Sequence, residues 1–266
     1  MRRTNIFTSF LQRTRNFILG ILLMNSFILS AQGASKENFE AGNAAYNEGD
    51  FTKAISFYEQ TLEMGQHSAA LYFNLGNAYY RLNKVAESIF YFEKAKQLDP
   101  DNEDIKVNST FAKNMTIDAI EAIPESQLAR IQKGIFRLFS LTAWSVFALI
   151  WLWLFTLFFI AYLFVKATNS KRIFFFLSIL SLVLFAGSLS ISFTLDQQQK
   201  ETQYAILFSN NIDIWSEPNQ RGEIQFTLHE GTKIQLLEAL DEWNKIRIAN
   251  GSEGWIKNAE FKSLNN

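Results

Sequence analysis

Apolar and polar residues follow different patterns in successive parts of the chain, and each pattern predicts a different structure. Residues 35–122 place apolar side chains at helical spacing among many charges, which predicts amphipathic helices. Residues 138–165 and 173–195 contain no charged side chain, and each run is long enough to cross a bilayer as a helix. From Tyr204 onward, apolar residues recur at every second position, which predicts short strands. We therefore expect a multidomain membrane protein with an all-α part, a transmembrane helical hairpin and a small all-β part.

The first 33 residues have the pattern of a secretory signal peptide. Four arginines precede an apolar run over residues 17–31, and small residues follow that run. A basic segment, a short apolar segment and a small-residue cleavage site are the three parts of such a peptide. We predict export with cleavage after Ala31 or Gly33. An uncleaved signal anchor is the alternative, but the apolar run is short for a membrane span.

Two membrane-spanning helices are predicted at residues 141–165 and 173–195. The loop KATNSKR between them is so short that the two helices must form a hairpin. A buried helix pair in a soluble protein is the alternative, although soluble cores rarely contain two such runs. An exported N-terminus places both flanking parts in the periplasm, and the basic loop then lies in the cytoplasm, as the positive-inside rule requires. The predicted location is the bacterial inner membrane, crossed twice.

Residues 125–139 predict a juxtamembrane amphipathic helix. Arg130, Lys133 and Arg137 lie on the outer side of the first span, where the positive-inside rule does not favour them. An interfacial helix accounts for them, because its apolar face rests on lipid while basic groups lie beside the headgroups. The apolar positions of this helix are Leu128, Ile131, Ile135 and Leu138.

The sequence GNAAY at residues 42–46 recurs as GNAYY at residues 76–80, an offset of 34. The similarity continues downstream, where Glu59 corresponds to Glu93. An offset of 34 is the period of the tetratricopeptide repeat, a helix–turn–helix unit, and residues 35–122 resemble that family. Gly42 and Gly76 are expected where the two helices of a unit approach closely. Two units cannot cover their own apolar faces, so residues 102–120 are predicted to form a capping helix, with the first half of a decayed third repeat as the alternative.

Stacked units of the tetratricopeptide family form a concave groove lined by the first helix of each unit. An asparagine amide both donates and accepts hydrogen bonds, so paired asparagines suit the backbone of an extended peptide. The alternative is that asparagine after glycine is ordinary repeat sequence. A net charge of −7 over residues 36–126 favours a neutral or basic partner. The groove candidates for peptide or protein binding are Phe39, Asn43, Tyr46, Phe73, Asn77, Tyr80 and Arg81.

Residues 203–264 predict a small all-β barrel, with a tight turn at Asn250-Gly251. The segment resembles the bacterial SH3 (SH3b) family at Pro218, at HEGT (229–232) and at GWI (254–256). This resemblance implies an SH3-like barrel whose groove binds peptides or cell-wall stem peptides. The groove candidates are Trp215, Trp243 and Trp255. At least one of them is expected to fill the core, because so small a barrel needs aromatic packing.

The sequence offers no pattern for catalysis. It contains no cysteine and only two histidines, His67 and His229, neither of them at metal-ligand spacing. We therefore expect no enzyme activity, no cofactor and no metal site. Residues 127–195 carry a charge of +6 with no acidic residue, between acidic parts of −7 and −4. Acidic soluble parts repel phosphate, so nucleic acid is not an expected partner.

The order of signal peptide, tetratricopeptide repeats, membrane hairpin and SH3b module resembles the Bat (aerotolerance operon) family, over the whole chain. The resemblance implies a non-catalytic inner-membrane scaffold that works with other Bat-family membrane proteins and a MoxR-type ATPase. The implied process is envelope maintenance or tolerance of oxidative stress. Two alternatives are a peptidoglycan-binding receptor that uses the SH3b module and a periplasmic assembly chaperone that uses the repeats.

Overall fold

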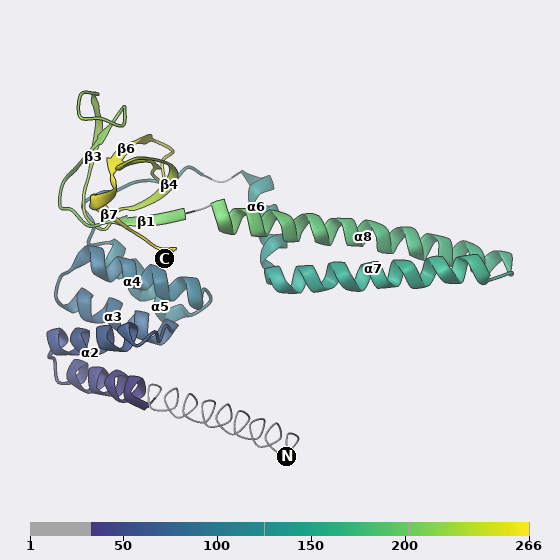
Figure 1. The fold of residues 1–266 in the computed structure, drawn as a ribbon, viewed down its shortest axis with the longest axis horizontal. Coiled ribbons are helices and arrows are strands. Elements are labelled where there is room, and N and C mark those ends of the chain that lie inside the picture. Colours follow the sequence, from purple (N-terminus) through teal and green to yellow (C-terminus); the bar gives the residue numbers. More distant parts are fainter. Residues whose placement is uncertain (1–32, 125, 202, 266) are drawn as a thin grey trace, which may run out of the picture.

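The computed structural model describes residues 33–124, 126–201 and 203–265, so the predicted signal peptide lies outside the described residues except for its last position. Figure 1 shows a group of stacked helices, a β-domain beside them and a long helix pair that extends away from both. The first described helix covers residues 33–47. The other helices are α2 (Phe51–Glu63), α3 (Ala69–Arg81), α4 (Val85–Leu98), α5 (Glu103–Lys113), α6 (Gln127–Arg137), α7 (Leu141–Phe164) and α8 (Thr168–Glu201).

The repeat helices begin and end where the local sequence dictates. Asp50 caps α2 by accepting a hydrogen bond from the backbone N–H of Lys53, and Ser68 caps α3 in the same way. Gly49 and Asn83 both adopt a left-handed backbone in the turns that follow the first helix of each unit, with φ of 84° and 58°. These two residues are 34 positions apart, so the sequence period is also a period of backbone geometry.

The glycines of the repeated motif lie at the contact between the two helices of each unit, which confirms the prediction. A Cβ atom added to Gly76 would lie 2.8 Å from Cδ1 of Phe92, and one added to Gly42 would lie even closer to the Tyr58 ring. Both aromatic rings are almost completely buried. The backbones can approach this closely only because neither position carries a side chain.

Helix α5 covers the second repeat only in part. Asn102 caps the helix, and Ile105 and Ala112 are buried against α4. Val107 and Phe111, which also belong to the apolar residues of this segment, are exposed. The β-domain completes the cover, because its Ile206 and Leu264 join the apolar cluster around α4. The prediction that residues 102–120 cap the stack is therefore incomplete.

The β-domain is a seven-stranded antiparallel sheet with the strand order β3-β2-β6-β5-β4-β1-β7. Its alternating apolar residues, such as Ile214 and Ile246, form a buried core, as the period-two pattern predicts. Gly251 has φ of 85° in the tight turn before β6. The elements are β1 (Gln203–Leu207), β2 (Ile212–Trp215), β3 (Ile224–Leu228), β4 (Lys233–Leu240), β5 (Trp243–Arg247), β6 (Glu253–Lys257), the short helix η1 (Asn258–Glu260) and β7 (Phe261–Ser263).

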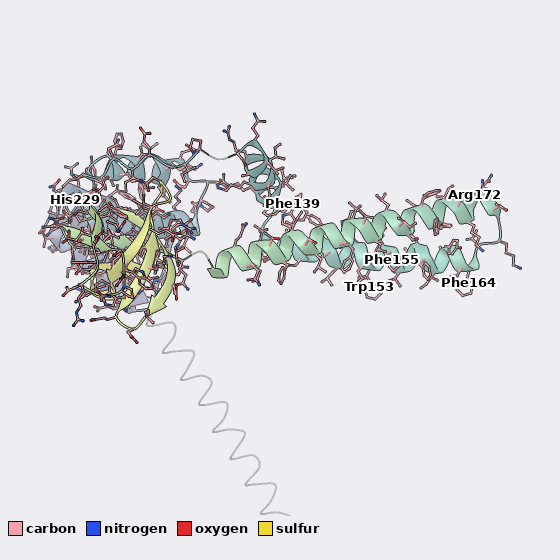
Figure 2. All side chains as sticks on the ribbon, turned by 90° about the horizontal axis from the view of Figure 1, so that it is seen from above. Phe139, Trp153, Phe155, Phe164, Arg172 and His229 are labelled. Carbon is pink, nitrogen blue, oxygen red and sulfur yellow. The ribbon has the colours of Figure 1, made fainter. Side chains whose placement is uncertain are left out.

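Helices α7 and α8 are both long and apolar enough to cross a membrane. Their side chains mostly face outward along the length of the pair; Trp153 is 74% and Phe164 is 79% exposed (Figure 2). Small residues let the two helices pack closely, and Ser145 and Ser192 share a hydrogen bond of 2.7 Å across the contact. The buried serines of α8 are Ser178, Ser181, Ser188 and Ser192.

The connection between α7 and α8 is shorter than the sequence predicted. Only residues 165–167 lie between the helices, because α8 already begins at Thr168. Lys171 and Arg172, which the sequence placed in a seven-residue loop, belong to the first turns of α8. Serine, lysine and arginine are all tolerated in a helix. These polar residues therefore mark where the apolar run of α8 begins, but the helix itself begins before them.

Helix α6 lies at the end of the helix pair nearest the stacked helices and runs across the axis of the pair (Figure 1). Ser126 caps it by accepting a hydrogen bond from the backbone N–H of Ala129. Its apolar residues Leu128 and Ile131 are exposed. This orientation agrees with a helix that rests on a membrane surface at the base of the pair.

A candidate binding groove on the repeats

Two adjoining pockets form a groove along the repeat helices. They have volumes of about 550 Å³ and about 180 Å³, and they share Tyr46 and Asn77. The larger pocket is lined by Glu40, Asn43, Tyr46, Asn47, Tyr58, Phe73, Asn74 and Asn77. The smaller pocket is lined by Tyr46, Asn77, Tyr80, Arg81, Phe92, Asn108 and Phe111.

The structure thus brings together six of the seven residues that sequence reasoning assigned to the groove. Phe39 is the exception, because it lines a different pocket and packs its ring 5.9 Å from that of Tyr58. Arg81 is held in place by Phe51, whose ring centroid lies 4.9 Å from the guanidinium carbon. The groove therefore combines aromatic rings and amides, with Glu40 in one pocket and Arg81 in the other.

The asparagines of the groove form a periodic ladder that sequence reasoning missed. Asn74 donates to Oδ1 of Asn43 over 2.8 Å, and Asn108 donates to Oδ1 of Asn77 over the same distance. Asn74 and Asn108 are 34 positions apart, so the repeat offset itself would have identified them. Each pair joins successive units, which supports a structural role for Asn43 and Asn77. An amide has two donor hydrogens and an acceptor oxygen, so each pair retains capacity for a ligand.

Tyr58 also hydrogen bonds to the first asparagine pair, Asn43 and Asn74, through Asn43. Its hydroxyl donates to Oδ1 of Asn43 over 2.9 Å. Burial raises the pKa of Tyr58 to about 12, so the hydroxyl keeps its proton and remains a donor at neutral pH. Asn43 is consequently engaged by Tyr58 and by Asn74, and its replacement would disturb the stack as well as the groove.

The three tryptophans of the β-domain have unequal exposure. Trp243 is only 6% exposed, with Lys257 above its ring, so it is a core residue. Trp215 and Trp255 lie opposite each other on β2 and β6 and are partly exposed. These two remain candidates for a ligand surface on the β-domain.

The β-domain uses its HEGT segment to contact the rest of the chain. Asp118, between α5 and α6, accepts hydrogen bonds from the backbone N–H of His229, from its ring Nδ1 and from the hydroxyl of Thr232, at 2.6–2.7 Å. Burial opposes the ionised form of Asp118, but these hydrogen bonds outweigh it and lower the pKa of the carboxyl. A Cβ atom on Gly231 would lie 3.0 Å from Val85 and Ile89 of α4. This turn is therefore enclosed within the chain.

A buried carboxylate joins the two domains next to this turn. Glu93 on α4 is almost completely buried, and its Oε2 lies 2.6 Å from Nζ of Lys233 on β4. Its Oε1 lies 2.6 Å from Nζ of Lys113 on α5, as an ionic contact rather than an aligned hydrogen bond. Burial alone would raise the pKa of Glu93, but the two lysines lower it to about 2. We call the repeats and the β-domain so joined, residues 33–124 and 203–265, the head.

No arrangement for metal binding occurs within residues 33–124, 126–201 and 203–265, where no group of three or more His, Cys, Asp or Glu residues could hold an ion. The two histidines lie in different places. His67 shares a 2.7 Å hydrogen bond with Tyr72, and His229 is engaged by Asp118. The described side chains that line the groove carry amides, aromatic rings, a carboxylate and a guanidinium.

Comparisons with known proteins find matches for the repeat region and for the β-domain. Residues 39–103 match the tetratricopeptide repeat family, and residues 210–262 match the bacterial SH3 domain family. The chain thus contains tetratricopeptide repeats and a bacterial SH3 domain, both of them interaction modules. Among solved structures, the Arabidopsis OM64 TPR domain is similar, with 26% identity over 32% of this chain and 69% of that one, and a TM-score of 0.31. No curated protein matches the chain.

Proposed function

We propose that this protein is a non-catalytic scaffold of the bacterial inner membrane whose repeat groove binds an extended segment of a partner protein in the periplasm. The open groove is the observation that carries the proposal. The HEGT turn of the SH3 domain is covered by Asp118 and α4, whereas no other described segment of the chain fills the groove. An extended peptide suits a groove of amides and aromatic rings.

The order of the modules supports a finer proposal. The chain is BatE-like, and its partners are other Bat-family membrane proteins and a MoxR-type ATPase complex, in aerotolerance or the response to oxidative stress. The net charge of −7 over residues 36–126 favours a neutral or basic segment of such a partner. The lipid bilayer is the remaining partner, through α6, α7 and α8.

A peptidoglycan-binding receptor is the second candidate. One observation favours it: Trp215 and Trp255 form a partly exposed pair across β2 and β6, away from the enclosed HEGT turn. Large, partly exposed tryptophan rings with a polar N–H suit binding to a ligand surface. Binding of purified sacculi by the full chain, lost in Trp255→Ala but kept in groove variants, would favour this candidate over the scaffold.

A groove variant tests the scaffold proposal. Phe111 lines the smaller pocket and is 54% exposed, so Phe111→Ser is expected to fold normally and to reduce partner recovery from native membranes at least fivefold, because exposed aromatic residues dominate such contacts. Leu98→Ser is the matched control, since Leu98 is equally exposed and lines neither groove pocket. If Phe111→Ser and Leu98→Ser recover the same amount of partner protein, the groove has no binding role.

The topology can be tested separately, because the chain has no cysteine of its own. Single cysteines at the exposed positions Gln97, Gln220 and Ala167 probe the repeats, the β-domain and the connection between α7 and α8. An impermeant maleimide added to spheroplasts should label the first two and spare Ala167→Cys until the membrane is permeabilised. Labelling of Ala167→Cys alone in intact spheroplasts would reverse the proposed orientation.

A further inference from the structure

The connection between α7 and α8 carries positive charge, and the acidic residues of the helix pair lie only at the far end of α8. Lys166, Lys171 and Arg172 lie there, and residues 127–195 contain no aspartate or glutamate. Asp196, the next acid along α8, is 24 residues beyond Arg172, or about 36 Å at the rise of an α-helix. The head is at the opposite end of the pair (Figure 2). No acidic side chain within residues 127–195 compensates the positive charge of this tip.

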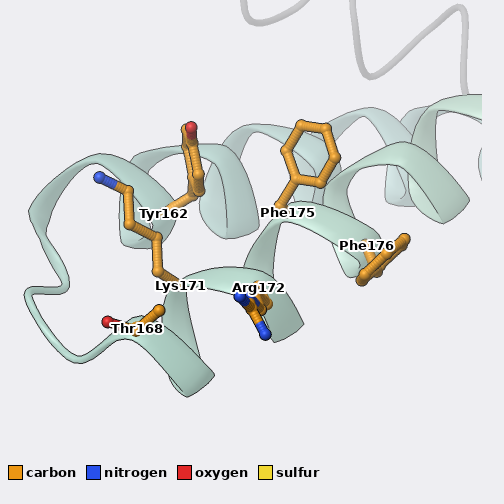
Figure 3. A pocket seen from close by; sticks show the side chains of 6 residues that line it. All are labelled: Tyr162, Thr168, Lys171, Arg172, Phe175 and Phe176. Carbon is orange, nitrogen blue, oxygen red and sulfur yellow. The ribbon is translucent and has the colours of Figure 1, made fainter.

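The same tip contains an open pocket of about 560 Å³ (Figure 3). Its polar groups are the Lys171 and Arg172 cations and the hydroxyls of Tyr162 and Thr168, and its apolar groups are the rings of Phe175 and Phe176. Nζ of Lys171 lies 5.1 Å from the centroid of the Tyr162 ring, which holds the ammonium group beside the pocket. Lys166 does not line the pocket.

The pocket lies where the apolar helices meet their polar connection. Helix α7 ends at Phe164 and α8 begins at Thr168, so cations and hydroxyls lie at the level of lipid headgroups when the pair spans a bilayer. Phe176 is 68% exposed on the side of the apolar run. Aromatic rings are enriched at this boundary, where one side contacts acyl chains and the other contacts headgroups.

We propose that this pocket binds the headgroup of an anionic phospholipid, with the phosphate between Lys171 and Arg172. Arginine and lysine form charge-assisted hydrogen bonds with phosphate oxygens, and the two hydroxyls add neutral donors. The rings of Phe175 and Phe176 then contact the glycerol and the first acyl carbons. These rings face the bilayer, which favours a lipid over a soluble phosphate. The site is independent of what the repeats bind. It needs anionic lipid only in the leaflet that surrounds the tip, whichever leaflet that is.

Native mass spectrometry of the full-length protein tests this site. The protein is purified in a neutral detergent and mixed with equal amounts of phosphatidylglycerol and phosphatidylcholine, and retained lipids are counted. Wild type should retain phosphatidylglycerol preferentially. Arg172→Gln and Lys171→Gln should each weaken that retention about fivefold, the effect of one basic group near a membrane surface. Lys166→Gln is the matched control, because it removes the same charge from the same connection outside the pocket.

Three results would overturn the proposal. Equal retention of the two lipids by wild type would show that no headgroup is recognised. Equal losses in Lys166→Gln and Arg172→Gln would indicate diffuse surface charge without a pocket. Displacement of phosphatidylglycerol by millimolar inorganic phosphate would indicate a site for a soluble anion. Circular dichroism establishes whether each variant folds. If Arg172→Gln does not fold, Arg172→Lys is used in its place; it keeps the charge and should retain most of the binding.

Discussion

Replacement of Lys233 by methionine is expected to lower the free energy of unfolding of the head by about 2–3 kcal/mol. Methionine preserves the aliphatic length of lysine but leaves the buried carboxylate of Glu93 with Lys113 as its one remaining salt-bridge partner among the described residues. Removal of one partner from a buried ion pair typically costs about 3–5 kcal/mol, and the remaining Lys113 contact reduces the loss. Denaturation of the full chain, followed by the fluorescence of the β-domain tryptophans, measures it.

The double variant Glu93→Met with Lys233→Met is the control for this result. It removes the buried charge together with its partner, and Lys113 is exposed enough to regain water. Replacement of a buried ionic group by apolar side chains of similar size is often neutral. The double variant should therefore recover most of the lost stability. If both variants lose the same amount, the methionine side chain and not the uncompensated charge would be the cause, contrary to this account.

The same carboxylate predicts how the stability of the head depends on pH. The lysines hold the pKa of Glu93 at about 2 in the folded state, below its ordinary value of 4.5. The stabilisation is therefore complete above pH 4.5 and is lost as the pH falls toward 2. In Lys233→Met the folded-state pKa rises, so acid unfolding should begin at a higher pH than in wild type. Identical acid transitions would contradict the assigned contact.

Replacement of Gly76 by leucine is expected to destabilise the repeats by about 3 kcal/mol, at the upper end for an overpacked core. Even the first added carbon would lie 2.8 Å from the Phe92 ring, and Phe92 is buried on all sides. The carbonyl of Gly76 also accepts a buried hydrogen bond of 2.9 Å from Ser88, so the backbone cannot move aside freely. Hydrogen exchange of α3 and α4 in the full chain measures the loss.

Ala44→Leu provides the matched control for Gly76→Leu. Ala44 belongs to the same repeated motif in the first unit, but its side chain is exposed. The added leucine should therefore change the exchange of the repeat helices by less than about 0.5 kcal/mol. Equal effects of the two substitutions would mean that Gly76 does not lie at a helix contact.

Periodic features of this protein were predictable from its sequence. The offset of 34 located the repeat helices and identified Gly42 and Gly76 as contact positions, because the same geometry recurs in each unit. Two uncharged runs identified α7 and α8, and the period-two pattern identified the strands. The same offset would also have indicated the asparagine ladder, had Asn74 been compared with Asn108.

The contact between the domains was not predictable, because it occurs once and has no period. Glu93 appears in the sequence as the repeat equivalent of Glu59, but Glu59 accepts a hydrogen bond from Tyr79 within the repeats, whereas Glu93 contacts Lys233 of the β-domain. Asp118 lies within residues 102–120, where the sequence predicted a capping helix, but α5 ends at Lys113 and Asp118 follows it outside the helix. Only the folded chain shows that this segment meets the HEGT turn.

The central claim is that the repeat groove, and not the SH3 domain, contacts the partner. Site-specific photocrosslinking in native membranes tests it most directly, with benzoylphenylalanine at Phe111 in the groove, at Trp255 on the β-domain and at Leu98 as a control outside the groove pockets. The account predicts a discrete crosslinked protein from Phe111 and none from Leu98. A crosslinked protein from Trp255 together with none from Phe111 would contradict it.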